Sequence, residues 1–429
     1  MKEHFRTLLQ GLLTQTTQAG KLDEALAIRE KITALTADTK TTTPAETAPV
    51  AKPTAPTGNS KLATAKSNGK TDPAAAQQII AWALANGSTV TTSLGIVGPE
   101  EKLKTAPAGK YSATEISMGP TAEGFPWSAL AGLGQLTRLG LGTDRALTEA
   151  ETQHFRHLGG LRVLSIGSVT EAGLQAMPLL PNLVELQVSP TQEDLPTFHL
   201  LQERTQSVTK LVISYKRIGK DAEAVFAALS GWLELKEVHS FISIKTALAQ
   251  HLARLPKLTR LYLFTGSTIE EGCLSLMPQL TTVNFNAKQS PGVLREVASL
   301  RNLGWFSFDM EGLTFADFPD FSGCPKLLKI EVENPPGLSS DIIAKCSFPQ
   351  GLYTLKLVKT EIDEAAVEML LKFKRLDILQ LVNCRFSAAA IEKLQNLKQP
   401  KEMDLRGSNL TDTDFKALQK ALPKCKINK

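Results

Sequence analysis

Leu352-Tyr353-Thr354-Leu355-Lys356-Leu357 is the stretch of sequence that decides the fold. It returns 376 − 352 = 24 residues later as Leu376-Asp377-Ile378-Leu379-Gln380-Leu381. Both copies read LxxLxL, and apolar residues two apart point to one side of a β-strand. The first apolar residue of successive units falls at 136, 161, 183, 208, 235, 258, 280, 303, 327, 352 and 376. These ten steps span 376 − 136 = 240 residues, a period of 24 that predicts a solenoid of repeats.

The segments between the strands also match one another. Residues 362–370, 386–394 and 410–418 each open with an apolar anchor, continue with polar residues typical of a helix start, and then carry apolar residues at helical spacing. Each unit is therefore predicted to be one strand followed by one helix. Over residues 133–427 this plan resembles the leucine-rich-repeat superfamily, in particular its bacterial and ribonuclease-inhibitor-like members. The resemblance implies an α/β horseshoe with parallel strands on the concave face and helices outside.

Two features depart from the family pattern. The asparagine ladder, three residues past the last strand leucine, is absent, and half of the units carry another small side chain there: Asp144, Thr191, Ser243, Thr360, Cys384 and Ser408. The unit at 235–257 also places Ser240 where an apolar residue belongs. We therefore expect irregular loops and an array of only moderate regularity.

Composition divides the chain into four parts. Residues 1–36 have apolar residues at helical spacing on both sides of Gly20 and predict a helical hairpin. Residues 37–72 are almost entirely Thr, Ala, Pro, Lys and Ser and predict a disordered linker. Residues 73–132 are predicted to cap the front of the solenoid with a helix and strands. Residues 133–429 form the repeat array and end in a capping strand near residues 422–427.

The bulk composition limits the class of protein. Lys and Arg number 48 against 43 acidic residues, which is too small a surplus for a nucleic-acid-binding chain. Neither a signal peptide nor a run of eighteen apolar residues is visible, so we expect a soluble, unsecreted chain, cytoplasmic as written, without membrane insertion. The cysteines are widely spaced and predict buried reduced thiols: Cys273, Cys324, Cys346, Cys384 and Cys425.

The sequence contains no catalytic constellation. His154 and His157 stand three residues apart on a possible helix face, but no acid or cysteine completes a convincing metal site with them. The glycines of residues 132–142 fit neither a phosphate-binding loop nor a dinucleotide fingerprint. We therefore predict no enzyme activity, no cofactor and no metal.

The positions between the strand leucines should face the concave side, because strand side chains alternate. In the middle units these positions become aromatic, and we predict that they bind a partner: His239, Phe241, Tyr262, Phe264 and Trp305. Earlier and later units carry small or charged residues there. The competing interpretation is a register slip that turns Phe241 inward, with Trp305 packed on a neighbour. Phe306 and Phe308 occupy leucine positions and are predicted to lie in the core.

The functional hypothesis is a non-enzymatic protein–protein interaction module that binds a macromolecular partner on its concave face. Self-association through the hairpin at 1–36 remains open. Two alternatives stand beside it: an exported carbohydrate- or cell-envelope-binding protein whose signal peptide is missing, and a regulatory fragment of a larger enzyme. Aromatic and polar concave residues would also suit sugar rings.

Overall fold

The structure is a computed structural model in which the chain divides into two units, Met1–Lys61 and Leu62–Lys429. The residues that the structure describes are 63–98, 101, 103–105, 111–119, 123–142, 146–191, 196–214, 229, 231–264, 266–335, 348–349 and 351–429. The hairpin predicted for 1–36 and most of the predicted linker lie outside them.

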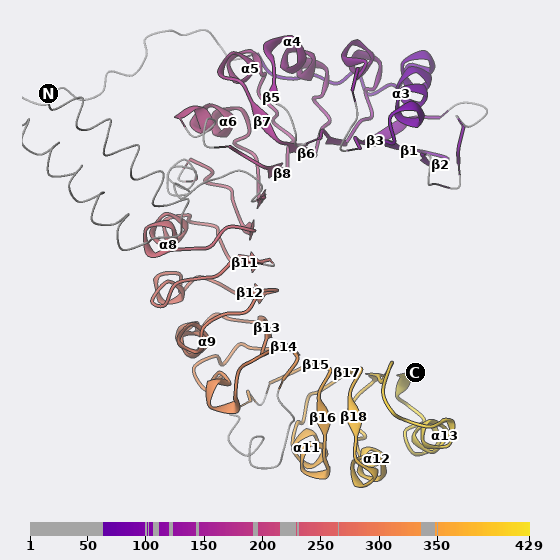
Figure 1. The fold of residues 1–429 in the computed structure, drawn as a ribbon, viewed down its shortest axis with the longest axis vertical. Helices are drawn as coiled ribbons and strands as arrows, with labels where there is room; N and C mark the ends of the chain where they lie inside the picture. The colour runs from indigo at the N-terminus through magenta and orange to yellow at the C-terminus, as the bar shows by residue number, and fades with distance from the viewer. Residues whose placement is uncertain are drawn as a thin grey trace, which may run out of the picture. The chain divides into compact units, whose positions relative to one another are not determined.

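Among the described residues of the second unit, 16 strands form one continuous sheet, in the order β2-β1-β3-β4-β6-β8-β9-β10-β11-β12-β13-β14-β15-β17-β19-β20. From β3 onward every neighbouring pair is parallel. In Figure 1 the strands of this unit line the inside of an arc, and the helices lie outside. The strands are β1 (Thr89–Thr92), β2 (Gly95–Val97), β3 (Ala113–Ser117), β4 (Arg138–Gly140), β6 (Val163–Ile166), β8 (Glu185–Val188), β9 (Lys210–Ile213), β10 (Glu237–Ser240), β11 (Arg260–Leu263), β12 (Thr282–Phe285), β13 (Trp305–Asp309), β14 (Lys329–Glu333), β15 (Thr354–Val358), β17 (Ile378–Val382), β19 (Glu402–Asp404) and β20 (Lys426–Asn428).

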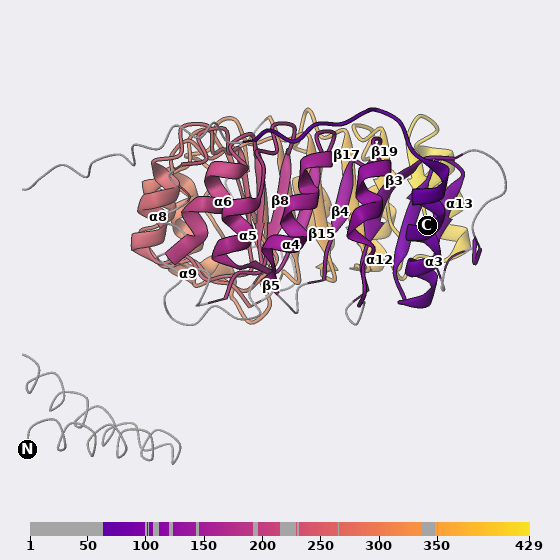
Figure 2. The ribbon, with the colours of Figure 1, turned by 90° about the horizontal axis from the view of Figure 1, so that it is seen from above.

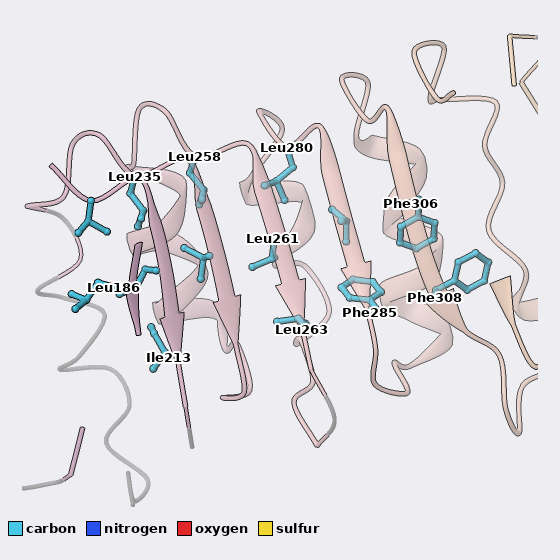
Figure 3. Close-up of a cluster of buried hydrophobic side chains, with 14 of the residues drawn as sticks. Leu186, Ile213, Leu235, Leu258, Leu261, Leu263, Leu280, Phe285, Phe306 and Phe308 are labelled. Atoms are coloured by element: carbon cyan, nitrogen blue, oxygen red, sulfur yellow. The ribbon is translucent and has the colours of Figure 1, made fainter. Parts of the chain in front are cut away.

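The predicted leucine positions form the core. Leu261 of β11, Phe306 of β13 and Leu379 of β17 each have no exposed surface. The parallel register aligns such residues across neighbouring strands, as Figure 3 shows for the middle of the sheet. Phe306 and Phe308 are both buried, with ring centroids 4.7 Å apart, so both are core residues as predicted. Each repeat thus buries its apolar side only against the repeats beside it.

The helical segments return the chain from the end of one strand to the start of the next. Side-chain caps begin several of them: Asp363 accepts a hydrogen bond from the Ala366 amide, and Thr411 and Asp414 form a capping box. The α-helices are α3 (Pro73–Ala85), α4 (Glu149–Thr152), α5 (Glu171–Ala176), α6 (Phe198–Arg204), α8 (Thr246–Ala253), α9 (Pro291–Glu296), α11 (Glu364–Leu370), α12 (Ala388–Leu394) and α13 (Asp412–Ala421). The 3-10 helices are η1 (Trp127–Gly132), η2 (Gln153–His157), η4 (Leu274–Leu276), η5 (Val297–Ser299) and η6 (Phe315–Asp317). Short strands pair beside them: β5 (Ala146–Leu147) with β7 (Ser168–Val169), and β16 (Glu361–Ile362) with β18 (Arg385–Phe386).

Antiparallel strands close the front of the sheet. β1 pairs antiparallel with both β2 and β3, and β3 then begins the parallel array by pairing with β4. Asp72 is the N-cap of helix α3, and its side chain accepts a hydrogen bond from the Ala74 amide. The helix buries Ile79, Ile80 and Trp82. The sequence predicted a helix and strands for residues 73–132, without placing a strand at β2. At the other end, β20 pairs with β19 as the expected closing strand.

Residues 63–72 correct the prediction of a linker over 37–72. Ala65 is 5% exposed, and its amide donates a hydrogen bond of 2.9 Å to the Leu179 carbonyl. The Lys66 amide donates to Arg156, and the Asp72 amide donates to Gly132. In Figure 2 this segment, the strap, runs along one edge of the repeats ahead of α3. Backbone bonds hold it in place, and these need no apolar period in the sequence.

Glycine on the repeats allows the strap to approach. A Cβ atom on Gly159 would lie 2.6 Å from the carbonyl carbon of Lys66, and one on Gly134 would lie 2.4 Å from the Lys70 carbonyl oxygen. Any other residue at these two positions would push the strap away.

The irregular positions noted in the sequence have local solutions. Ser240 is fully buried, and its hydroxyl both donates to the Ile242 carbonyl and accepts from the Ile242 amide, closing the turn after β10. The thiol of Cys384 is buried and donates to the Leu357 carbonyl, 3.5 Å away, in the preceding repeat. Burial raises the pKa of Cys384, and also that of Cys324, to about 11.

The strands, helices and register together make this unit an α/β leucine-rich-repeat solenoid, as the sequence pattern predicted. Within the described residues, no helix is both long and apolar enough to cross a membrane.

Candidate interaction site on the concave face

The parallel register places the aromatic residues predicted from the sequence on neighbouring strands. Glu237, Val238, His239 and Ser240 of β10 pair in order with Arg260, Leu261, Tyr262 and Leu263 of β11. Val238 and Leu261 lie in the core, so His239 and Tyr262 face the concave side together. The register slip considered for the 235–257 unit does not occur within β10.

Five ring side chains form one connected group, here called the aromatic cluster: His239, Phe241, Tyr262, Phe264 and Trp305. Their ring centroids are 4.4 Å apart for His239 and Tyr262, 5.4 Å for His239 and Phe264, and 4.7 Å for Phe241 and Phe264. Trp305 joins from β13 through an edge contact with Tyr262 at 6.1 Å. All five side chains are half-buried, neither core residues nor fully exposed.

Tyr262 and Trp305 meet across β12, because the intervening strand has small residues on this side. Thr282 and Asn284 of β12 are only 8% and 9% exposed, although they lie on the concave face in register with these neighbours. The side-chain oxygen of Asn284 and the indole nitrogen of Trp305 are both buried and have no hydrogen-bond partner among the described residues. A buried polar atom left unpaired costs roughly 1–3 kcal/mol, so a ligand or water that bonded to these two atoms would be favoured.

A ladder of alternating charges runs beside the cluster. Glu237 accepts from His239 at 2.6 Å and pairs with Arg260 at 2.9 Å, and Lys210 bridges to Glu185 at 3.1 Å. The hydrogen bond from His239 is the main cause that holds the pKa of Glu237 below its usual value. Burial raises this pKa, and the positive charge of Arg260 lowers it further. Burial, together with the Glu237 charge, raises the pKa of Tyr262. The pairs neutralise one another, so the surface around the cluster has no strong single charge.

Lys329 is a member of this surface that the sequence analysis missed. Its ammonium group lies 4.0 Å from the centre of the Trp305 ring and 3.2 Å from a Glu331 carboxylate oxygen. Lys329 stands in register with Trp305 on the next strand. An alignment of the repeat columns would have placed it there, but a search for aromatic residues alone could not.

The histidines considered as metal ligands lie elsewhere. Burial and the neighbouring Arg156 charge lower the pKa of His154 and of His157. The Nε atom of Arg156 donates to Nε2 of His157 at 3.0 Å. Within the described part of the chain, no group of three or more His, Cys, Asp or Glu side chains is placed to hold a metal ion.

No family model and no curated protein matches this chain. Among solved structures, it is similar to an internalin from Listeria monocytogenes at 15% identity and a TM-score of 0.43, covering 73% of this chain and 86% of that one. A leucine-rich-repeat protein of Leptospira interrogans matches at 15% identity and a TM-score of 0.40, covering 74% and 90%. A chain of the mouse RP105/MD-1 complex matches at 14% identity and a TM-score of 0.41, covering 73% and 54%. At this level the likeness carries no argument about what the chain binds.

Proposed function

We propose that this chain is a non-enzymatic protein-interaction module that binds a protein partner on its concave face through the aromatic cluster. The observation that carries the proposal is the connected group of five half-buried rings from His239 to Trp305. Grouped aromatic residues with partly open surface are typical of the energetic centre of an interface. The core of the solenoid does not require them, since Leu261 and Val238 fill the inward positions of the same strands.

The polar atoms beneath the rings suit a polypeptide. Both atoms are buried in this structure, but once the rings move apart on binding, a backbone amide could donate to the oxygen of Asn284, and a backbone carbonyl could accept from the indole nitrogen of Trp305. The paired charges Glu237, Arg260 and Lys210 would form a polar rim around this centre.

A carbohydrate ligand fits the cluster less well. Sugar rings stack on open aromatic faces, but Phe241 and Phe264 stack on each other with an angle of 13° between their planes. Lys329 covers the Trp305 ring as well. Three of the aromatic rings therefore already use a face for contacts within the protein.

The test compares three immobilised full-length proteins: the parent, the double variant Tyr262→Ala with Trp305→Ala, and a control, Lys356→Ala with Gln380→Ala, changed on the same face of β15 and β17. Proteins captured from an extract of the source cells are identified by quantitative mass spectrometry. The dissociation constant of each purified candidate is then measured by calorimetry. Central interface aromatics contribute about 2 kcal/mol or more each, so the double variant should bind roughly 700-fold more weakly.

The control should bind within about threefold of the parent. A partner that binds the aromatic double variant as tightly as the parent would show that the cluster is not the site. Binding to an immobilised glycan array with the same sensitivity to the two variants would establish the carbohydrate alternative instead.

A further inference from the structure

One edge of the solenoid has a distinctive set of side chains. We call it the strand-start rim: the loops that connect each helical segment to the next strand, together with the strap at residues 63–72. The strap marks this edge in Figure 2, because its hydrogen bonds go to Gly132, Arg156 and Leu179, which lie at or just beyond the ends of helical segments. The opposite edge holds the loops that lead from strands into helices.

Basic residues dominate the strand-start rim in the described part of the chain. Its loops contain the exposed residues Arg162, Lys236, Arg254, Lys257, Arg301, Lys326, Lys372, Lys374, Arg375, Lys398, Lys401 and Lys424, and the strap adds Lys66 and Lys70. The carboxylates there are few and already engaged. Glu234 pairs with Lys257, Asp377 pairs with Lys401, Asp320 accepts from Ser322, and Asp72 caps α3.

Most of these cations have no counter-charge among the described residues. No described residue forms an ion pair or side-chain hydrogen bond with Arg162, Lys236, Arg254, Arg301, Lys374, Arg375, Lys398 or Lys424. The opposite edge carries the carboxylates that begin helices, such as Asp363, Asp414 and Glu171. Helix dipoles explain why acidic residues lie at the starts of helices and why basic residues lie within one turn of their ends. They do not account for cations further along the loops, such as Arg162, Lys236 and Arg375.

Exposed apolar side chains gather on the same rim. Leu233, Leu328 and Tyr353 lie in its loops and are 60%, 50% and 42% exposed, and Leu276 ends η4 beside it at 39%. The other large apolar residues exposed to this degree among those described are Leu94 and Ile96, in the front cap. Leu328 and Tyr353 are adjacent, because the Tyr353 amide donates to the Leu328 carbonyl at 2.8 Å.

We propose that the strand-start rim docks on the surface of an anionic phospholipid bilayer. Unpaired Lys and Arg side chains attract anionic headgroups, each contributing about fivefold to binding near a membrane surface. Exposed leucine and tyrosine side chains gain by entering the interface between headgroups and acyl chains. A soluble polyanion would bind through the cations alone, whereas a bilayer would bind both the cations and the exposed apolar side chains. The proposal does not depend on the concave face, which remains open to a protein partner.

Co-sedimentation of the full-length protein with vesicles tests this surface. The vesicles contain either phosphatidylcholine alone or phosphatidylcholine with phosphatidylserine. The parent should bind the second kind, not the first, and lose binding as salt rises. Lys374→Glu with Arg375→Glu should lower the partition coefficient by about thirtyfold or more, because two cations are lost.

A matched control carries the same change of net charge on the opposite edge. Lys245→Glu with Arg385→Glu alters exposed residues on the opposite edge, the N-cap of α8 and the first residue of β18, and should lower vesicle binding by less than about threefold, because these cations lie far from the docked surface. Leu328→Ser with Tyr353→Ser keeps the charge and should weaken vesicle binding several-fold, but leave retention on a heparin column unchanged. The aromatic-cluster variant Tyr262→Ala with Trp305→Ala should bind vesicles like the parent.

Three results would overturn the proposal. The parent could show no preference for phosphatidylserine vesicles at low salt. The control on the opposite edge could lose as much binding as Lys374→Glu with Arg375→Glu. That result would mean that the net charge of the protein alone determines vesicle binding. Finally, Leu328→Ser with Tyr353→Ser could bind vesicles as tightly as the parent, while Lys374→Glu with Arg375→Glu weakens retention on the heparin column. This pair of results would identify a soluble polyanion as the ligand. Melting curves confirm that each variant is folded.

Discussion

Strands β11 and β17 have equivalent inward faces and different outward faces. Leu261 of β11 and Leu379 of β17 are both completely buried. On the concave side, β11 presents Tyr262 inside a cluster of rings, whereas β17 presents Gln380 at the same kind of position. The fold therefore dictates the inward residues in every repeat and leaves the outward ones free. What differs between repeats on the outward side is where binding specificity can reside.

The largest expected effect lies on the inward side and should be equal in the two strands. Leu261→Ala and Leu379→Ala each leave a cavity between three adjacent repeats and should lower the free energy of unfolding by about 2–5 kcal/mol. Urea unfolding followed by circular dichroism measures the loss. Gln380→Ala, on the outward side of β17, should change it by less than about 0.5 kcal/mol. A loss below about 1 kcal/mol for either leucine would mean that its strand is out of the register described here.

A smaller effect on stability is expected on the outward side of β11. Fully exposed residues could be removed at almost no cost to the free energy of unfolding. In the structure Tyr262 and Trp305 contact each other, Lys329 lies over Trp305, and Asn284 lies beneath them with 9% exposure. Tyr262→Ala with Trp305→Ala should therefore cost about 1–2 kcal/mol, from one aromatic pair and one cation–π contact.

Thermal melting of this double variant beside Leu261→Ala decides between the two views of the cluster. If the double variant melts far below Leu261→Ala, the rings are structural, and the interface assignment fails.

The sequence predicted the inward half of the molecule well, because the core of a solenoid repeats. Each leucine position is set by alternation along one strand and by the same position in the next repeat, so a single pattern specifies residues as distant as Leu139 and Leu379. The aromatic cluster was also found this way, since register converts the columns of the repeat into neighbours in space. Its role in binding stays a prediction.

The features that the sequence missed do not repeat. The strap is held by backbone hydrogen bonds to Leu179 and Arg156, which any residue except proline can make. The edge strand β2 has no counterpart in the array, and Ile96 within it is 46% exposed, so apolar alternation did not reveal it. The sequence did not reveal the strand-start rim, because each loop holds at most three of its cations and the loops lie about one repeat apart, so the cations form no long run along the chain.

The smallest expected effect compares one carboxylate from each region as the pH falls. Hydrogen bonding from His239 lowers the pKa of Glu237, beside the aromatic cluster, and hydrogen bonding from Arg406 lowers the pKa of Asp404, on β19. A carboxyl group whose pKa is lower in the folded state stabilises the fold above its unfolded pKa, about 4.3 for Glu and 3.9 for Asp, and this contribution disappears as the pH falls through the folded value. Urea midpoints of Glu237→Gln and Asp404→Asn, measured from pH 7 downward, should therefore fall less steeply below about pH 4 than the parent's. At pH 7 each variant should lose about 1 kcal/mol or less, since the amide that replaces the carboxylate can still accept a hydrogen bond and the partners Arg260 and Arg406 are 46% and 65% exposed. A Glu237→Gln protein with the parent's acid dependence would show that the His239 pair adds no stability and leaves the ring contacts alone to order this part of the concave face.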